Sequence, residues 1–157
     1  MTLSLALLGP PGTVPVGRPA GVHAQLRNDG PDEVWVVGVL DGSETGTRYP
    51  LWRPTVERDG VVVAAPGPAE DPLVGPLRAE DFHRLAAGET FAAGRLATFA
   101  LFAPAEPGDY RYRLELSTES PSDADWLGRF NQAAEVAGLV RRVPRLTLSA
   151  GLVVPFR

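Results

Sequence analysis

A strict alternation of apolar and polar side chains is the feature that most constrains how this chain can fold. Residues 110–117 read YRYRLELS, so every second side chain is apolar along the whole segment. Successive side chains of a β-strand point to opposite faces, and a strand with one buried face alternates in this way. Residues 22–27 and 146–152 show the same pattern, and the leucines within 3–7 predict an opening strand. The sequence therefore predicts several half-buried strands.

Turn residues separate these predicted strands. The run NDGPD at 28–32 cannot continue a strand, and PGD at 107–109 introduces the strand that starts at Tyr110. Asp59-Gly60 lies between two strand-like runs and predicts a two-residue hairpin, because Asp and Gly tolerate positive φ. Short strands joined by such turns are typical of an antiparallel sandwich and not of alternating β-α-β units.

The segment 34–40 departs from the alternation, because both of its faces are apolar. One face holds Trp35, Val37 and Val39, and the other holds Val34, Val36 and Leu40. A strand that is apolar on both faces must be covered on both. We expect the opposing sheet to cover one face and either an inserted segment or a partner chain to cover the other. A homodimer through strand 34–40 is therefore one prediction.

The spacing of apolar residues changes to threes and fours after Ser122. They recur as Trp126, Phe130, Ala133, Ala137 and Val140. This spacing predicts one short or broken helix, within an insertion at about 119–143, that packs the side carrying Trp126 and Phe130 on the sheet. Ser122 with Asp125 resembles a capping box. The arginines at 141–142 suit a helix C-terminus, and Pro144 prevents continuation.

Composition excludes several kinds of chemistry. The 157 residues include no cysteine, which excludes disulfides, Cys-ligated metals and thiol nucleophiles. All 15 basic residues are arginine, so mechanisms that need a lysine are excluded. The net charge of −4, without a dense basic tract, argues against nucleic acid as the partner. No stretch approaches the ~20 apolar residues of a membrane span, and the N-terminal apolar run is too short for a signal sequence. We expect a cytoplasmic protein without a membrane partner.

Few residues could carry catalysis or bind a metal. His23 and His83 are the only histidines, and their spacing matches no metal motif. The run DGSE at 41–44 places a serine among carboxylates but has no adjacent histidine, so we interpret it as a turn. The sequence thus predicts no catalytic residue, no metal ligand and no cofactor. A small metal-dependent site or enzyme at Asp41, Glu44 and His83 is the last of the alternatives.

The stretch RYPLWR at 48–53 carries the strongest candidates for partner binding. It lies in a segment, 41–54, that we predict as a long loop, as we also do for 65–88. Arginine, tyrosine and tryptophan dominate the energetics of protein interfaces. We therefore take as partner-binding candidates Arg48, Tyr49, Trp52 and Arg53. The alternative is that the two aromatic side chains pin this loop to the edge of the sandwich.

Four pieces of the chain form a wider pattern. They are the strand-turn-strand at 26–34, the hairpin at 56–61, the strand approach at 85–89 and the strand entry at 107–110. Together they resemble bacterial Ig-like sandwiches of the intracellular proteinase inhibitor type, in which the entry tyrosine forms a tyrosine corner with upstream backbone. The chain is also similar to stand-alone bacterial proteins of unknown activity through its LDGS…RYP segment at 40–50.

The sequence as a whole predicts an all-β fold. We expect an Ig-like antiparallel two-sheet sandwich of about seven to nine strands, in one domain over residues 1–157, with one short helical insertion before the last strand. We predict a non-catalytic protein-binding module, whose partner the sequence does not identify. The resemblance implies one alternative, the inhibition of a cytoplasmic protease by loop insertion.

Overall fold

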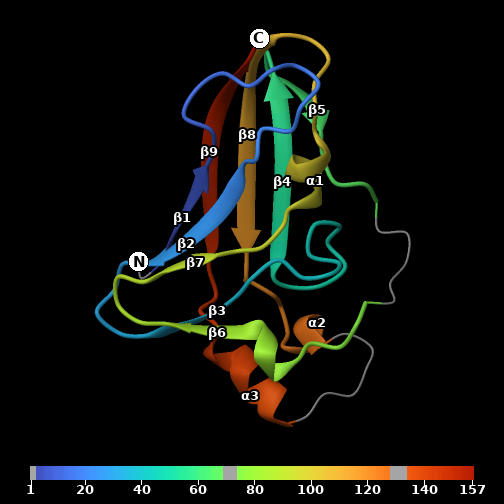
Figure 1. Ribbon diagram of the computed structural model, residues 1–157. Helices are drawn as coiled ribbons and strands as arrows, with labels where there is room; N and C mark the ends of the chain where they lie inside the picture. The colour runs from blue at the N-terminus through green and yellow to red at the C-terminus, as the bar shows by residue number, and fades with distance from the viewer. Residues whose placement is uncertain (1–2, 69–73, 128–133) are drawn as a thin grey trace.

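The computed structural model describes residues 3–68, 74–127 and 134–157 (Figure 1). The strands are β1 (Leu3–Leu8), β2 (His23–Asn28), β3 (Val34–Val37), β4 (Leu51–Arg58), β5 (Val61–Ala64), β6 (Phe82–Leu85), β7 (Thr90–Ala92), β8 (Gly108–Ser117) and β9 (Thr147–Phe156). The helices are η1, a 3₁₀ turn (Ala79–Asp81), α1 (Ala97–Leu101), α2 (Ala124–Leu127) and α3 (Ala134–Arg142). In the ranges given above, no helix is long and apolar enough to cross a membrane.

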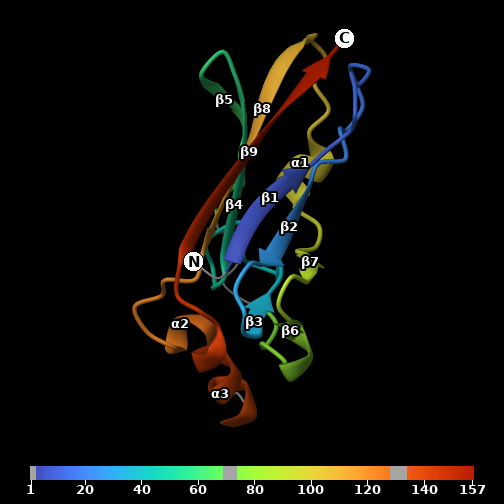
Figure 2. The ribbon, with the colours of Figure 1, turned by 90° about the vertical axis from the view of Figure 1, so that its left-hand side faces the viewer.

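Two antiparallel sheets face each other. One has the order β1-β2-β7, and the other has the order β5-β4-β8-β9. Figure 2 shows them as two layers, with β1 and β2 on one side and β9, β8 and β4 on the other. This is the arrangement of an Ig-like domain, in which the A, B and E strands face the G, F, C and C′ strands. The predicted fold class is therefore confirmed.

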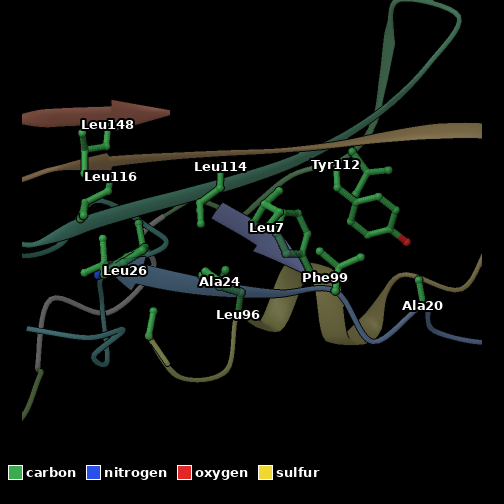
Figure 3. Close-up of a cluster of buried hydrophobic side chains, with 14 of the residues drawn as sticks. Leu7, Ala20, Ala24, Leu26, Leu96, Phe99, Tyr112, Leu114, Leu116 and Leu148 are labelled. Atoms are coloured by element: carbon green, nitrogen blue, oxygen red, sulfur yellow. The ribbon is translucent and has the colours of Figure 1, made fainter. Parts of the chain in front are cut away.

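The main core lies between these two sheets (Figure 3). Leu7, Ala24 and Leu26 reach it from the three-stranded sheet, whereas Tyr112 and Leu114 reach it from β8. The alternation along β8 is carried through without a break, because its inward side chains are at most 3% exposed and its outward ones are open to solvent. The strand thus has one apolar and one polar face, as its sequence predicts.

The predicted turns form as expected. Asp59 and Gly60 join β4 to β5 with φ values of 52° and 79°, which is the primed-turn geometry that their side chains allow. At the start of β8, the Tyr110 hydroxyl donates a hydrogen bond of 2.9 Å to the carbonyl of Glu106. This is the tyrosine corner that the resemblance implied.

Asn28 organises the turn that follows β2. Its side chain is fully buried, and its Nδ2 donates to the carbonyls of Asp32 and Leu85 at 2.8 and 3.0 Å. Its Oδ1 accepts a bond from the N–H of Gly30. Because a buried amide is costly without partners, these bonds fix the turn and join it to the end of β6.

A second buried cluster lies beneath the sandwich, around the two-stranded sheet of β3 and β6. Val34 and Val36 face the main core, whereas Val37 faces Trp126 and α3. The inserted segment therefore covers the second apolar face of β3. The homodimer stays a prediction, although this face, which suggested it, is already covered. The predicted strand 34–40 ends at Val37. The next residue, Gly38, lies against the carbonyl of Ala93, where a Cβ would come within 2.5 Å.

The insertion before β9 contains helical structure, as predicted, at α2 and at α3. Asp125 accepts from the N–H of Ser122, and the Ser122 hydroxyl accepts from the N–H of Ala124, which fixes the start of α2. Trp126 is fully buried against β3 and β6. Phe130 and Ala133, which the helical pattern also included, lie outside the described residues.

Two local predictions were wrong, and one helix was not predicted. The predicted loop 41–54 ends at Pro50, because β4 already begins at Leu51 and pairs with β8 from that residue. The predicted loop 65–88 contains β6, whose two central side chains are exposed and hide the strand pattern. Helix α1 was missed because no side chain near its own N-terminus caps it.

Two neighbouring tyrosines provide a matched test of the core. The hydroxyl of Tyr112 is buried and has no hydrogen-bond partner among the described residues, and burial raises its pKa to about 12. We expect Tyr112→Phe to raise the free energy of unfolding by about 1 kcal/mol, because it removes an unpaired buried donor. Tyr110→Phe removes a formed bond and should lower it by about 1 kcal/mol. Urea denaturation measures both.

The Tyr112→Phe variant also tests the raised pKa of Tyr112. An unfolded tyrosine ionises near pH 10, whereas Tyr112 resists ionisation in the folded protein until about pH 12. Ionisation of Tyr112 therefore does not affect stability below pH 10, and it lowers the free energy of unfolding progressively as the pH rises from 10 toward 12. Urea denaturation repeated across this range should show a shallower fall in stability for Tyr112→Phe than for the wild type. Equal slopes would contradict the assignment.

Candidate partner-binding site

Three of the four predicted partner-binding residues have side chains engaged inside the molecule. Trp52 is fully buried in the main core, and Tyr49 stacks on Trp126 with ring centroids 6.1 Å apart. Arg48 is 6% exposed and its Nη1 donates to the carbonyl of Gly75, so it ties two surface segments together. Burial lowers the pKa of Arg48, and the nearby carboxylates of Asp81 and Asp41 partly offset this. The stacking of Tyr49 fits the alternative that aromatic side chains pin the loop, whereas Trp52 lies in β4 and not in the loop.

Arg53 is the predicted candidate that reaches the surface, where it stands on the outer face of the four-stranded sheet. The register of β4, β8 and β9 places side chains on this face in cross-strand rows. The rows are Arg53–Glu115–Ser149, Thr55–Arg113–Gly151 and Glu57–Arg111–Val153. A shallow hollow of about 530 Å³ lies over these rows, and we call it the arginine hollow; its lining includes Arg53, Thr55, Arg111, Arg113, Ser149 and Gly151.

Gly151 helps to form the arginine hollow, because it has no side chain that would fill it. It lies inside the ten-residue strand β9, in extended backbone outside the left-handed region, and a Cβ there would meet only the carbonyl oxygen of Tyr112 at 3.6 Å. Neither backbone conformation nor close packing therefore requires a glycine. A glycine inside a strand costs roughly 0.5–1 kcal/mol relative to alanine. Such a glycine often marks a place where a ligand or another backbone approaches closely.

The charges around the hollow favour an anion. Arg113 lies 3.3 Å from Glu57 in an exposed pair. Arg53 and Arg111 make no ion pair within 4.0 Å to any residue that the structure describes. Glu115 stands across from Arg53, so three arginines face two glutamates here. A chain with a net charge of −4 thus carries locally excess positive charge on this face.

The residues of the alternative metal or catalytic site have separate structural roles. Glu44 accepts bonds from the N–H groups of Ala97 and Thr98 and from the Thr98 hydroxyl, so it caps α1. The Ser43 hydroxyl is buried and accepts from the N–H of Leu40. His83 lies on β6 with its ring 4.6 Å from that of Phe91. Across the described ranges, no three His, Asp or Glu side chains are grouped to hold a metal ion.

A second surface is apolar. The edge strand β5 exposes three consecutive valines, Val61 to Val63, and Leu101 of α1 is 73% exposed. A groove of about 410 Å³ runs between α1 and residues 64–67, which follow from β5. Exposed apolar edge strands are interaction sites or aggregation hazards. The described residues of this surface show no charge pattern that would identify a partner.

Sequence reasoning missed Arg111, Arg113 and Gly151. The two arginines were assigned to the polar face of a strand, and the glycine fell within a run that was interpreted only as alternating. A glycine within a strand pattern was the signal available, because it points to a bulge or to a close approach. The pairing register is continuous through Gly151, which excludes a bulge.

Comparisons with known proteins do not assign the chain to a family. No protein-family model matches it, and no curated protein is similar to it at a significant level. Among solved structures it is similar to the CARDB domain of a protein from Pyrococcus furiosus, determined by solution NMR. The sequence identity is 16% and the TM-score is 0.38, with 99% of this chain and 94% of that chain covered.

The cap on α1 gives a direct test of the role assigned to Glu44. We expect Glu44→Ala to lower the free energy of unfolding by about 1 kcal/mol, because it leaves N–H groups at the start of α1 without their acceptor. Glu33→Ala, which removes only an exposed pair with Arg84, should change it by less than about 0.5 kcal/mol. Equal effects in urea denaturation would show that the cap is not formed.

Proposed function

We propose that the chain is a non-catalytic binding module that holds an acidic segment of a partner protein in the arginine hollow. The observation that carries this proposal is the position of Gly151. It opens a space in the middle of a regular strand, and Arg113 stands directly across from that space on β8. Arg111 lies in the next row, beside Val153.

Arginine suits this role. Its planar guanidinium binds a carboxylate through two parallel N–H···O bonds. One exposed arginine–carboxylate pair contributes only about 0.2–1 kcal/mol. A useful affinity therefore needs several pairs, which an extended segment with more than one Asp or Glu provides. The three arginines stand on two adjacent strands, so such a segment can contact more than one of them.

The side chains that line the arginine hollow favour a role in binding over a role in catalysis. Neither histidine is on this face, because His23 lies on β2 in the opposite sheet and His83 lies on β6. The hydroxyls of Thr55 and Ser149 line the hollow without an imidazole beside them. Arginine cannot accept a proton at neutral pH and contributes positive charge and hydrogen-bond donors. These groups can recognise a carboxylate, and neither histidine lines the hollow to act as a base for a serine nucleophile.

A peptide library tests the charge of the partner. Random dodecapeptides displayed on phage are panned against the immobilised protein and against the double variant Arg111→Glu with Arg113→Glu. We expect the wild type to enrich peptides rich in Asp and Glu, and the double variant to lose them. Arg95→Glu is the control, because Arg95 is exposed in another part of the surface. Enrichment of basic or apolar peptides would refute the acidic partner.

A single substitution tests the role of Gly151. We expect Gly151→Thr to raise the free energy of unfolding by about 0.5–1 kcal/mol, because threonine suits an exposed strand better than glycine. The same change should weaken binding of a fluorescein-labelled peptide of alternating Glu and Val by at least about tenfold, measured by fluorescence anisotropy. Ser117→Thr adds a methyl group to the same face outside the hollow and should change binding less than twofold. A more stable variant with unchanged binding would contradict the proposal.

A further inference from the structure

We propose that the acidic segment binds as an additional β-strand along the free edge of β9, beside residues 147–153. This inference rests on the proposed function and specifies how the partner is held. Addition of an extended peptide to an exposed sheet edge is a general mode of recognition, in which backbone bonds give affinity and side-chain contacts give specificity. The evidence comes from the pairing of β9 and from the direction of its backbone groups.

β9 is the last strand of its sheet and pairs only with β8 along residues 147–153. Figure 2 shows β9 along the side of the molecule, with β1 beside it. β1 belongs to the other sheet and pairs with β2. The C-terminal end of β9 is paired on this side, where Val14 forms a parallel bridge to Phe156, and Gly9 lies against the side chain of Leu152. Among the described residues, no backbone group pairs with the edge of β9 between Thr147 and Val153.

Hydrogen bonds at the two ends of β9 show which backbone groups face this edge. Val14 donates to the carbonyl of Pro155 at 2.9 Å, and the N–H of Arg157 donates to Val14 at 3.1 Å. At the other end, Leu146 accepts from the N–H of Thr118, on the β8 side. Backbone groups alternate in direction along a strand, so odd-numbered residues of β9 direct theirs away from β8.

Ser149, Gly151 and Val153 consequently direct their N–H and C=O groups to the open edge. The backbone hydrogen bonds found among the described residues include none from these three. Pro155, whose nitrogen carries no hydrogen, occupies an edge-facing position and breaks no bond to β8. Proteins block free edges with bulges, inward charges or proline. β9 has an unbroken register with β8 and no proline between Thr147 and Val153.

An added strand would bring its outward side chains to the arginine hollow. Neighbouring strands lie about 4.8 Å apart, so a residue of the added strand opposite Gly151 is about 9.6 Å from the backbone of Arg113. Gly151 has no side chain to fill the space between them. A glutamate on the added strand and the arginine on β8 can therefore meet above Gly151. The same strand passes Val153, beyond which Arg111 lies on β8.

The decisive variant is Ser149→Pro, which removes one edge-facing N–H and leaves the bonds to β8 in place. Ser149→Ala is its matched control, because it removes the same hydroxyl and keeps the N–H. We expect the labelled Glu-Val peptide to bind Ser149→Pro at least about tenfold more weakly than Ser149→Ala, because the two variants differ in the edge-facing N–H and both lack the hydroxyl. Circular dichroism and thermal denaturation establish that each variant is folded. If folded Ser149→Pro binds like Ser149→Ala, strand addition is refuted.

A second measurement tests strand addition with the wild-type protein. It remains informative even if the Ser149→Pro variant fails to fold. Two Glu-Val peptides carry N-methyl groups, one on every glutamate and the other on every valine. Only one set of amides can face β9, so we expect the two affinities to differ by at least about tenfold. Equal affinities for the two peptides refute strand addition. If strand addition fails here while the double arginine variant still loses acidic peptides, the proposed function stands with a different binding geometry.

Discussion

The burial of the inner face of β8 is the interaction on which the rest of the structure depends. Tyr112, Leu114 and Leu116 pack against the three-stranded sheet, while the strand pairs with β4 on one side and β9 on the other. Because side chains alternate strictly, the packing that holds these residues inside also fixes Arg111 and Arg113 outside. A slip of one residue would exchange the two faces. The hydrophobic core thus positions the arginine hollow, although no core residue contributes charge to it.

The second buried cluster supports a different part of the molecule. Trp126 and α3 cover the face of β3 that the main core leaves bare, and Tyr49 joins the 41–50 segment to them. Arg145 strengthens this region, because its guanidinium lies 4.9 Å from the ring centroid of Trp126 and also bonds Asp123. The aromatic stretch that stood out in the sequence therefore serves packing. Its neighbour Arg53, one position beyond Trp52, faces the opposite way because strand β4 has already begun.

The sequence predicted those parts of the structure that depend on residues close together in the chain. The alternation of β8, the Asp59-Gly60 hairpin and the cap formed by Ser122 and Asp125 are all local patterns, and each is confirmed. Helix α1 was not predictable in this way, because its cap is Glu44, more than 50 positions earlier in the chain. The arginine hollow was missed for the same reason. Its residues come from three strands, and only the pairing register brings them together. Protease inhibition, which the resemblance implied, stays a prediction.

The short parallel bridge between Val14 and Phe156 has a consequence for molecular recognition. The chain's own N-terminal segment occupies the C-terminal end of the β9 edge and acts as a stop there. A guest strand can extend from Thr147 only as far as this stop, a length of about 23 Å at 3.3 Å per residue. For the strand addition proposed above, this stop would limit sliding toward the C-terminal end of β9.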